Sequence, residues 1–290
     1  MPRNNENRLG APMPDSDPPH QILEDRTSPT DTLSFVVPTE FVDLPSAGRF
    51  YPPSHPLHNK EHVEIKYMTA KEEDILTSQS LLEKGLALDR LISNLLVNKK
   101  INVDSLLVGD KSAILIAARS SGYGADYETD VGCPSCGESQ RCVYDLSTVP
   151  SHGGAASKAF ETDGLTLNER GNFVTTLPRN PVTVEFRLLT GRDETALVNA
   201  SAKRRKKNAP DSLITDQLKL MIVSINDYND FELISEFVNT MTLADSRHLR
   251  DLYQKVCPSI ELKEVFVCDS CSYEDDIIFP FTTDFFWPQQ

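Results

Sequence analysis

The fold of this chain is expected to depend on two short cysteine motifs, Cys133-Pro134-Ser135-Cys136 and Cys268-Asp269-Ser270-Cys271. In each motif two residues separate the cysteines, so both sulfurs of a tight turn can face one ion. Four thiolates complete the tetrahedral shell that Zn²⁺ prefers. Apolar stretches such as Val265-Phe266-Val267 and Ile277-Ile278-Phe279 flank the motifs and are typical of strands. Each motif therefore predicts the knuckle of a β-hairpin, which is half of a zinc ribbon.

The segments that precede the two motifs match in register. Asp110 begins a helix signal ahead of Cys133, and Asp245 begins another at the same distance ahead of Cys268. Aspartate is favoured at such a position because its side chain caps the free N–H groups of the first helical turn. A single constant offset relates the two segments without a gap. The match predicts a duplicated unit.

The predicted fold class is α+β, with two pseudo-repeated helix-plus-hairpin units joined through a zinc-ribbon-like site of four cysteines. A looser similarity between residues 67–73 and 188–194 supports the repeat. The predicted domains are a flexible or extended N-terminal arm at residues 1–33, a first unit at 34–149, and a second unit at 150–290 with an aromatic C-terminal tail. The arm is rich in Pro, Asn, Asp and Ser and has too few apolar groups to offset the entropy of ordering.

The predicted metal ligands are Cys133, Cys136, Cys268 and Cys271, and the predicted cofactor is a structural Zn²⁺. The sequence leaves open whether these residues form one shared site or two separate ones. A shell of four cysteines has no open position for an activated water, so this metal is not expected to be catalytic.

Local patterns predict the other elements. Thr69 and Glu72 form a capping box at the start of a helix that extends to near Gly85. The turn at residues 45–48 is expected to present Phe50 and Tyr51 as core anchors. Further predicted strands lie at 33–38, 62–67 and 182–188, a hairpin lies at 165–177, and further helices lie at 86–96, 192–202, 213–224, 231–241 and 245–256.

Composition limits the class of protein. The chain has 290 residues and a formal net charge of −14, which argues against binding to nucleic acid or to an anionic membrane. No apolar run approaches the roughly 20 residues of a membrane helix, and no signal peptide is recognisable at the start. A cytosolic location is therefore expected, and the six cysteines indicate metal ligands rather than disulfides.

Motifs for catalysis are missing. Neither a phosphate-binding glycine loop nor a metalloprotease or hydrolase motif occurs, so the chain is predicted not to be an enzyme and to have no catalytic or cofactor-binding residues. Cys142 and Cys257 are expected to be small buried hydrophobes. A metal site at His55, His58 and His62 is disfavoured because Pro56 breaks the helix that would align the rings.

Two features leave alternatives open. The basic run at residues 203–207 could contact phosphates or an acidic partner, although a solvated helix end is favoured because cations suit a helix C-terminus. The aromatic tail at residues 285–288 could dock on the chain's own core or on a neighbouring subunit.

Several segments within residues 35–147 have a distinctive sequence. They are Leu44–Pro52, His55–Leu57, Val63–Leu76 with its Tyr-Met-Thr-Ala-Lys-Glu-Glu-Asp-Ile-Leu string, Leu107–Lys111 and Cys133–Gly137. Together they resemble one family, the T4-like bacteriophage baseplate hub subunits and hub assembly proteins, and the closing aromatic tail resembles it more weakly.

The resemblance implies a structural virion component of a contractile-tail baseplate, assembled in the host cytoplasm and active through protein contacts. Implied partners are other phage baseplate and tail proteins, and self-association is a further expectation; no membrane partner is expected. One alternative is a transient hub assembly chaperone that is absent from the mature particle. A third hypothesis is a zinc-ribbon nucleic-acid-binding protein that uses the basic run, against which the negative net charge argues.

Overall fold

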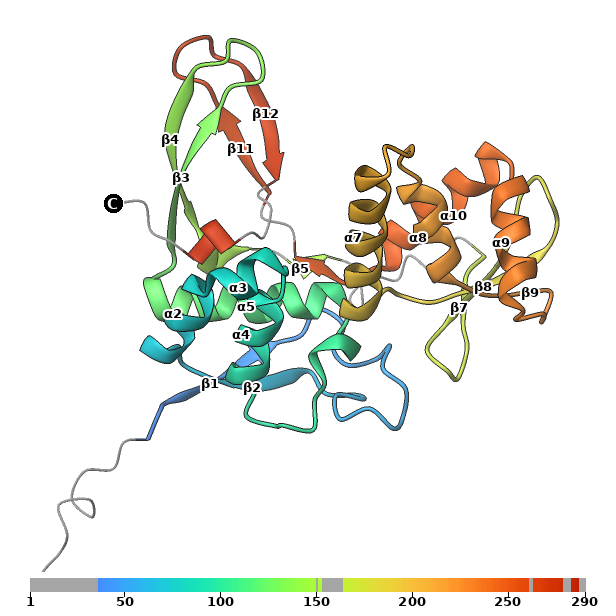
Figure 1. Ribbon diagram of the computed structural model, residues 1–290, viewed down its shortest axis with the longest axis horizontal. Helices are drawn as coiled ribbons and strands as arrows, with labels where there is room; N and C mark the ends of the chain where they lie inside the picture. The colour runs from blue at the N-terminus through green and yellow to red at the C-terminus, as the bar shows by residue number, and fades with distance from the viewer. Residues whose placement is uncertain (1–35, 150, 153–163, 261–262, 279–282, 287–290) are drawn as a thin grey trace, which may run out of the picture. The chain divides into compact units, whose positions relative to one another are not determined.

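Figure 1 shows the structure, a computed structural model that describes residues 36–149, 151–152, 164–260, 263–278 and 283–286. The described residues from 37 onward belong to one compact unit. The predicted arm at residues 1–33 lies outside the described residues, as does most of the small-residue stretch that follows residue 150. The division into domains at residue 150 stays a prediction.

Helices and small antiparallel sheets alternate along the chain. The elements up to residue 149 are β1 (Thr39–Asp43), β2 (His62–Lys66), α2 (Ala70–Thr77), α3 (Gln79–Glu83), α4 (Ala87–Leu95), η1 (Val103–Ser105), α5 (Val108–Tyr123), β3 (Asp126–Gly132), β4 (Ser139–Asp145) and η2 (Leu146–Thr148). Those that follow are β5 (Ser151–His152), β6 (Thr166–Leu167), β7 (Phe173–Thr176), β8 (Thr183–Phe186), α7 (Gly191–Lys206), α8 (Leu213–Met221), β9 (Ile222–Ile225), α9 (Phe231–Thr240), α10 (Leu243–Val256), β10 (Ser259–Ile260), β11 (Lys263–Val267), β12 (Glu274–Ile278) and η4 (Thr283–Phe286). The mixed α and β content agrees with the predicted class.

The sheets are all small. β6, β7, β8 and β9 form a four-stranded sheet in that order, and the other sheets are the pairs β1–β2, β3–β4, β5–β10 and β11–β12. Every strand pairing among the described residues is antiparallel. Most of them join strands that follow one another in the chain, as is typical of hairpins, whereas β5–β10 and β8–β9 join strands that are far apart in the sequence.

Two helices that follow hairpins, α2 after β1–β2 and α7 after β7–β8, each begin with a capping box. At α2 the side chain of Thr69 caps the first turn, and Glu72 accepts a hydrogen bond from the Thr69 N–H at 3.0 Å. At α7 the same arrangement joins Thr190 and Asp193, with a distance of 2.8 Å from the Thr190 N–H to the carboxylate. The box predicted at Thr69 is confirmed.

Three predicted element boundaries are wrong. The sequence predicts the first strand at residues 33–38, of which 33–35 lie outside the described residues; residues 36–38 form no strand, and β1 begins at Thr39, after a proline that has no N–H to give to a strand. The helix predicted to extend to Gly85 breaks at Ser78 into α2 and α3. The helix predicted at 213–224 ends at Met221, because the next residues form β9 beside β8.

The expectation that Asp110 and Asp245 begin and cap helices is wrong: the N-cap residues of α5 and α10 are Leu107 and Thr242, and the two aspartates lie buried in the first turns. The carboxylate of Asp110 accepts a hydrogen bond from the backbone N–H of Ser46 at 3.1 Å. That of Asp245 accepts one from the backbone N–H of Arg179 at 2.9 Å. Asp110 also accepts from the hydroxyl groups of Ser46 and Tyr51. Burial raises the pKa of the Asp110 carboxyl, although these hydrogen bonds oppose the rise.

Residues before and after the predicted boundary at 150 share one buried core. Its fully buried large side chains include Ile65, Leu76, Leu91, Phe173, Phe186, Phe266, Phe285 and Phe286. Phe50 and Tyr51 are buried as well, so their predicted role as core anchors is confirmed.

Close contacts across that boundary are polar as well as apolar. The ammonium of Lys111 in α5 lies 2.7 Å from Asp89 and 3.1 Å from Glu194 of α7. At Gly109 an added Cβ would lie 1.9 Å from the carbonyl oxygen of Pro258, so the backbone of α5 approaches the chain just before β10 closely enough to require glycine.

Candidate metal centre

Each cysteine motif lies at the tip of a β-hairpin. β3 pairs with β4 from Asp126↔Asp145 to Gly132↔Ser139, and β11 pairs with β12 from Lys263↔Ile278 to Val267↔Glu274. Figure 1 shows the two hairpins side by side with their tips at the same end. Both predicted knuckle hairpins are therefore present, and the question is how their sulfurs lie.

The two tips have the same backbone. In the first, the N–H of Gly137 donates to the carbonyl of Cys133 at 2.9 Å; in the second, the N–H of Ser272 donates in the same way to Cys268, also at 2.9 Å. Gly137 has a φ of 76° and Ser272 a φ of 56°, so both adopt the left-handed conformation. Glycine adopts it at little cost, whereas serine is strained there.

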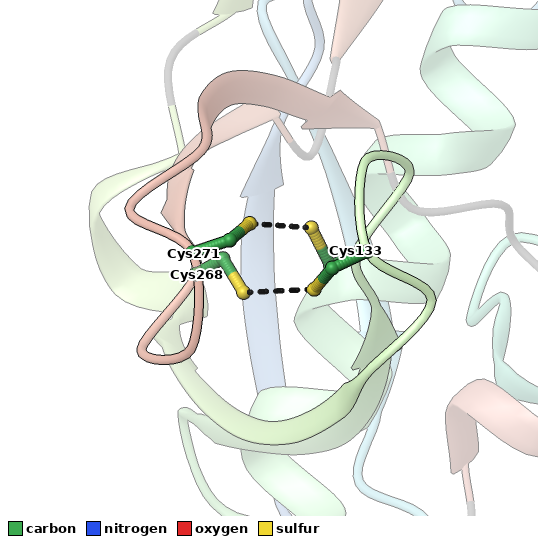
Figure 2. A group of neighbouring side chains, drawn as sticks. Cys133, Cys268 and Cys271 are labelled. Atoms are coloured by element: carbon green, nitrogen blue, oxygen red, sulfur yellow. Dashed lines mark hydrogen bonds between the residues drawn. The ribbon is translucent and has the colours of Figure 1, made fainter.

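The four sulfurs converge on one point. Those of Cys133 and Cys271 are 3.6 Å apart, and those of Cys136 and Cys268 are 3.7 Å apart. All four lie within 4.8 Å of one another, and none forms a disulfide. Figure 2 shows the side chains of the two tips pointing toward each other across the gap. A tetrahedral Zn²⁺ with Zn–S bonds of about 2.3 Å places its sulfurs about 3.8 Å apart, so this group could hold one metal ion.

Each tip contributes one buried and one exposed cysteine. Cys133 and Cys268 are buried, whereas Cys136 and Cys271 are exposed. Burial opposes ionisation of the Cys133 thiol, but the backbone N–H groups of Cys136 and Ser135 donate to it and lower its pKa to about 7. A metal binds the thiolate, and these donors favour that form of Cys133 only. At Cys136 the backbone N–H of Glu138 is outweighed by the neighbouring thiols and by desolvation, which raise the pKa to about 12.

Gln140 of β4 joins the two hairpins without being a ligand. Its side-chain N–H donates to the carbonyl of Val267 at 2.8 Å, and its side-chain oxygen accepts from the N–H of Asp269 at 2.8 Å. Those two backbone groups flank Cys268, so the amide of Gln140 holds this cysteine in place as a neighbouring strand would. Sequence reasoning missed Gln140, because a glutamine that bonds to backbone groups has no local signature.

No other metal site is found among the described residues: the four cysteines form the single group of three or more histidine, cysteine or acidic ligands there. The histidines first considered contact separate partners. His55 bonds to Ser105 and stacks on Tyr51, His58 bonds to the Tyr51 carbonyl, and His62 bonds to Asp43.

The two remaining cysteines lie outside the group. Cys142 and Cys257 are half-buried, and burial raises the pKa of the Cys257 thiol. A thiol that stays protonated in an apolar environment agrees with the expected role of a small hydrophobe.

The described part of the aromatic tail docks on the chain's own core. Phe285 and Phe286 are fully buried, whereas residues 287–290 lie outside the described residues. Arg119 of α5 fixes this segment by donating to the carbonyl of Phe285 at 3.1 Å. Its guanidinium also donates to the carbonyls of Gly124 and Asp126. Sequence reasoning gave no hint of this buried arginine.

The predicted basic run ends α7, whose last turn contains Lys203, Arg204, Arg205 and Lys206. Arg204 pairs with Asp216 of α8, and the other three side chains are exposed. In the part of the chain that the structure describes, no helix has the length and apolar character needed to span a bilayer.

These features define a mixed α and β protein with a group of four cysteines that could hold a metal ion. The chain belongs to the family of T4 bacteriophage base plate proteins, whose family model matches residues 39–287. The match includes the second half of the chain, where the resemblance in sequence was weaker. Comparisons with curated proteins and with solved structures found no match. Membership implies a virion component that contacts other phage tail proteins.

Proposed function

We propose that this chain is a structural protein of the hub region of a contractile-tail baseplate, assembled in the host cytoplasm and stabilised by one Zn²⁺. The ion is bound by Cys133, Cys136, Cys268 and Cys271 as in a zinc ribbon. The observation that carries the proposal is the convergence, in a baseplate protein, of sulfurs whose residues are 132 and 138 positions apart in the chain. A closed shell of four cysteines suits a structural role.

We further propose that the two halves are pseudo-repeats. Each contains a hairpin, a helix that starts with a capping box, a later helix with a buried aspartate, and a hairpin with a cysteine tip. The starts of α5 and α10 are separated by the same number of positions as the two cysteine motifs. The metal then joins equivalent parts of the two repeats. The boundary at residue 150 and the separate arm at residues 1–33 belong to the same proposal.

Two measurements test the function. Mass spectrometry of purified, nuclease-treated phage particles is expected to find a fixed number of copies of this chain for each tail. Elemental analysis of the isolated protein is expected to find one zinc for each chain. Absence from particles together with abundance in infected lysate would instead favour a transient assembly chaperone, and a metal-free protein with normal stability would overturn the structural zinc.

A further inference from the structure

The surface formed by helices α7 and α8 combines an apolar groove with a cluster of cations. The groove has a volume of about 470 Å³ and is lined by Leu197, Val198 and Ala202 of α7 and by Leu213 of α8. Val198 is 63% exposed and Leu213 is 58% exposed. Large apolar side chains that are grouped and open to solvent usually mark an interaction site.

The cations lie at one end of this groove. Arg205 lines it directly, and the exposed Lys206 follows the lining residue Ala202 by one helical turn, whereas Glu194, which pairs with Lys111, lines the other end. Helix α7 exposes these cations although the chain as a whole has a formal net charge of −14. The partner that fits such a surface has carboxylates beside small apolar side chains.

The two cysteine hairpins of this chain have that composition. The segments at residues 126–145 and 263–278 each contain five acidic residues and one basic residue. Three valines are exposed among them, namely Val143 at 60%, Val265 at 57% and Val267 at 50%. In the strand register, Val265 lies opposite Asp276 and Val267 lies opposite Glu274, so each of these valines has a carboxylate beside it on the hairpin.

We propose that the α7–α8 surface binds the acidic cysteine hairpins of a second copy of this chain. The valines enter the groove, and the carboxylates face Arg205 and Lys206. Because the two surfaces are different, the contact is head-to-tail and leaves one free surface of each kind on a dimer. Repetition of the contact produces a closed ring or an open filament. This inference concerns contacts between copies, so it can fail while the proposed baseplate function holds.

Sedimentation of the zinc-loaded full chain over a range of concentrations and salt tests the proposal. The wild-type chain is expected to self-associate, and more weakly at high salt because ions screen the charges. Replacing cations (Arg205→Glu with Lys206→Glu) or carboxylates (Glu274→Lys with Asp276→Lys) is expected to weaken self-association by at least about tenfold. A control with the same charge change as the first pair, Lys66→Glu with Lys84→Glu, is expected to leave it unchanged.

Mixing the two altered proteins gives the decisive result. In each variant alone, the α7–α8 surface and the hairpins have the same sign of charge and repel. In the mixture, the unchanged acidic hairpins of the first variant can bind the unchanged basic α7–α8 surface of the second, so the mixture is expected to associate. This outcome also shows that both variants are folded. A wild-type chain that stays monomeric up to its solubility limit would overturn the proposal, as would self-association that neither pair of charge reversals weakens or a mixture that remains monomeric.

Discussion

Loss of the proposed shared zinc site should cost stability mainly because the bridge crosses a long stretch of chain. The sulfurs of Cys133 and Cys271 belong to residues 138 positions apart. For a loop of that length, the entropy of closure predicts a contribution of about 5 kcal/mol from constraining the unfolded chain. At about 2–4 °C for each kcal/mol in a domain of this size, the midpoint of thermal unfolding should fall by about 10–20 °C.

The test compares Cys136→Ser and Cys271→Ser with the variant that contains both changes. If one ion joins the two tips, either substitution removes it. The free energies of unfolding of the double variant and of each single variant should then agree within about 0.5 kcal/mol. Thermal unfolding followed by circular dichroism measures stability, and elemental analysis measures zinc. Cys142→Ser is the matched control, because Cys142 is half-buried in the same hairpin but lies outside the four-sulfur group.

The reasoning would be refuted by two zinc ions in each wild-type chain, with one ion left in each single variant and additive losses in the double variant. That pattern would mean that each tip completes its own site with other ligands. A chelator provides a second check, since it should lower the unfolding midpoint of the wild-type chain to that of Cys136→Ser and leave the variant unchanged.

Three further predictions concern other residues. Ser272→Gly should raise the free energy of unfolding by about 1 kcal/mol, because serine is strained at a φ of 56°. Gly137→Ser should lower it by a similar amount. Thermal unfolding measures both changes, and shifts of the same sign would contradict the explanation. Gln140→Ala should weaken metal binding by about tenfold in a chelator competition. The absorption spectrum of bound Co²⁺, which reports the identity of the ligands, should stay unchanged. An unchanged affinity would show that the amide does not position the site. Asp110→Asn should become more stable relative to the wild-type chain as the pH rises from about 4 to 7, because a carboxyl whose pKa is raised by burial costs stability once it ionises. Asp193→Asn should show the opposite trend at lower pH, because burial of that carboxyl is outweighed by the Arg187 guanidinium and its pKa is lowered. The wild-type chain then gains stability relative to this variant mainly as the pH rises from about 2 to 4, so urea unfolding from about pH 2 to 7 distinguishes the two.

Much of the candidate site could be predicted because it depends on local chemistry. The spacing within each cysteine motif determines a turn, and the flanking apolar residues determine the strands. The capping box at Thr69 involves residues three positions apart, which is also local. The meeting of the two tips could only be inferred from the number of ligands, since each tip supplies two thiolates and one Zn²⁺ binds four. Their actual separation depends on how the two hairpins pack.

The errors fall where tertiary contacts decide. Ile222–Ile225 is a short apolar run that fits a helix or a strand equally well, and pairing with β8 selects the strand. Arg119 could not be recognised, because its acceptors are backbone carbonyls such as that of Phe285, 166 positions away. Gln140 was missed for the same reason. Groups that bond to backbone atoms leave no pattern in the sequence, whereas pairs of cysteines do.

The spacing of the proposed repeats indicates where the chain tolerates changes in length. The offset is the number of positions between a residue of the first repeat and its equivalent in the second. It is slightly shorter for the Leu-Pro pairs at Leu44 and Leu177 than for the cysteine motifs. It is shortest for the capping threonines Thr69 and Thr190. From the buried aspartates to the last cysteines the offset is the same at every equivalent position. The changes in length therefore fall in the loop between the two strands of the first hairpin of each repeat, and in the segment between the helix with the capping box and the helix with the buried aspartate. The uninterrupted segment connects a buried helix to a cysteine tip. The proposed shared metal would account for its constant length, because both tips must then reach the same point from equivalent helices.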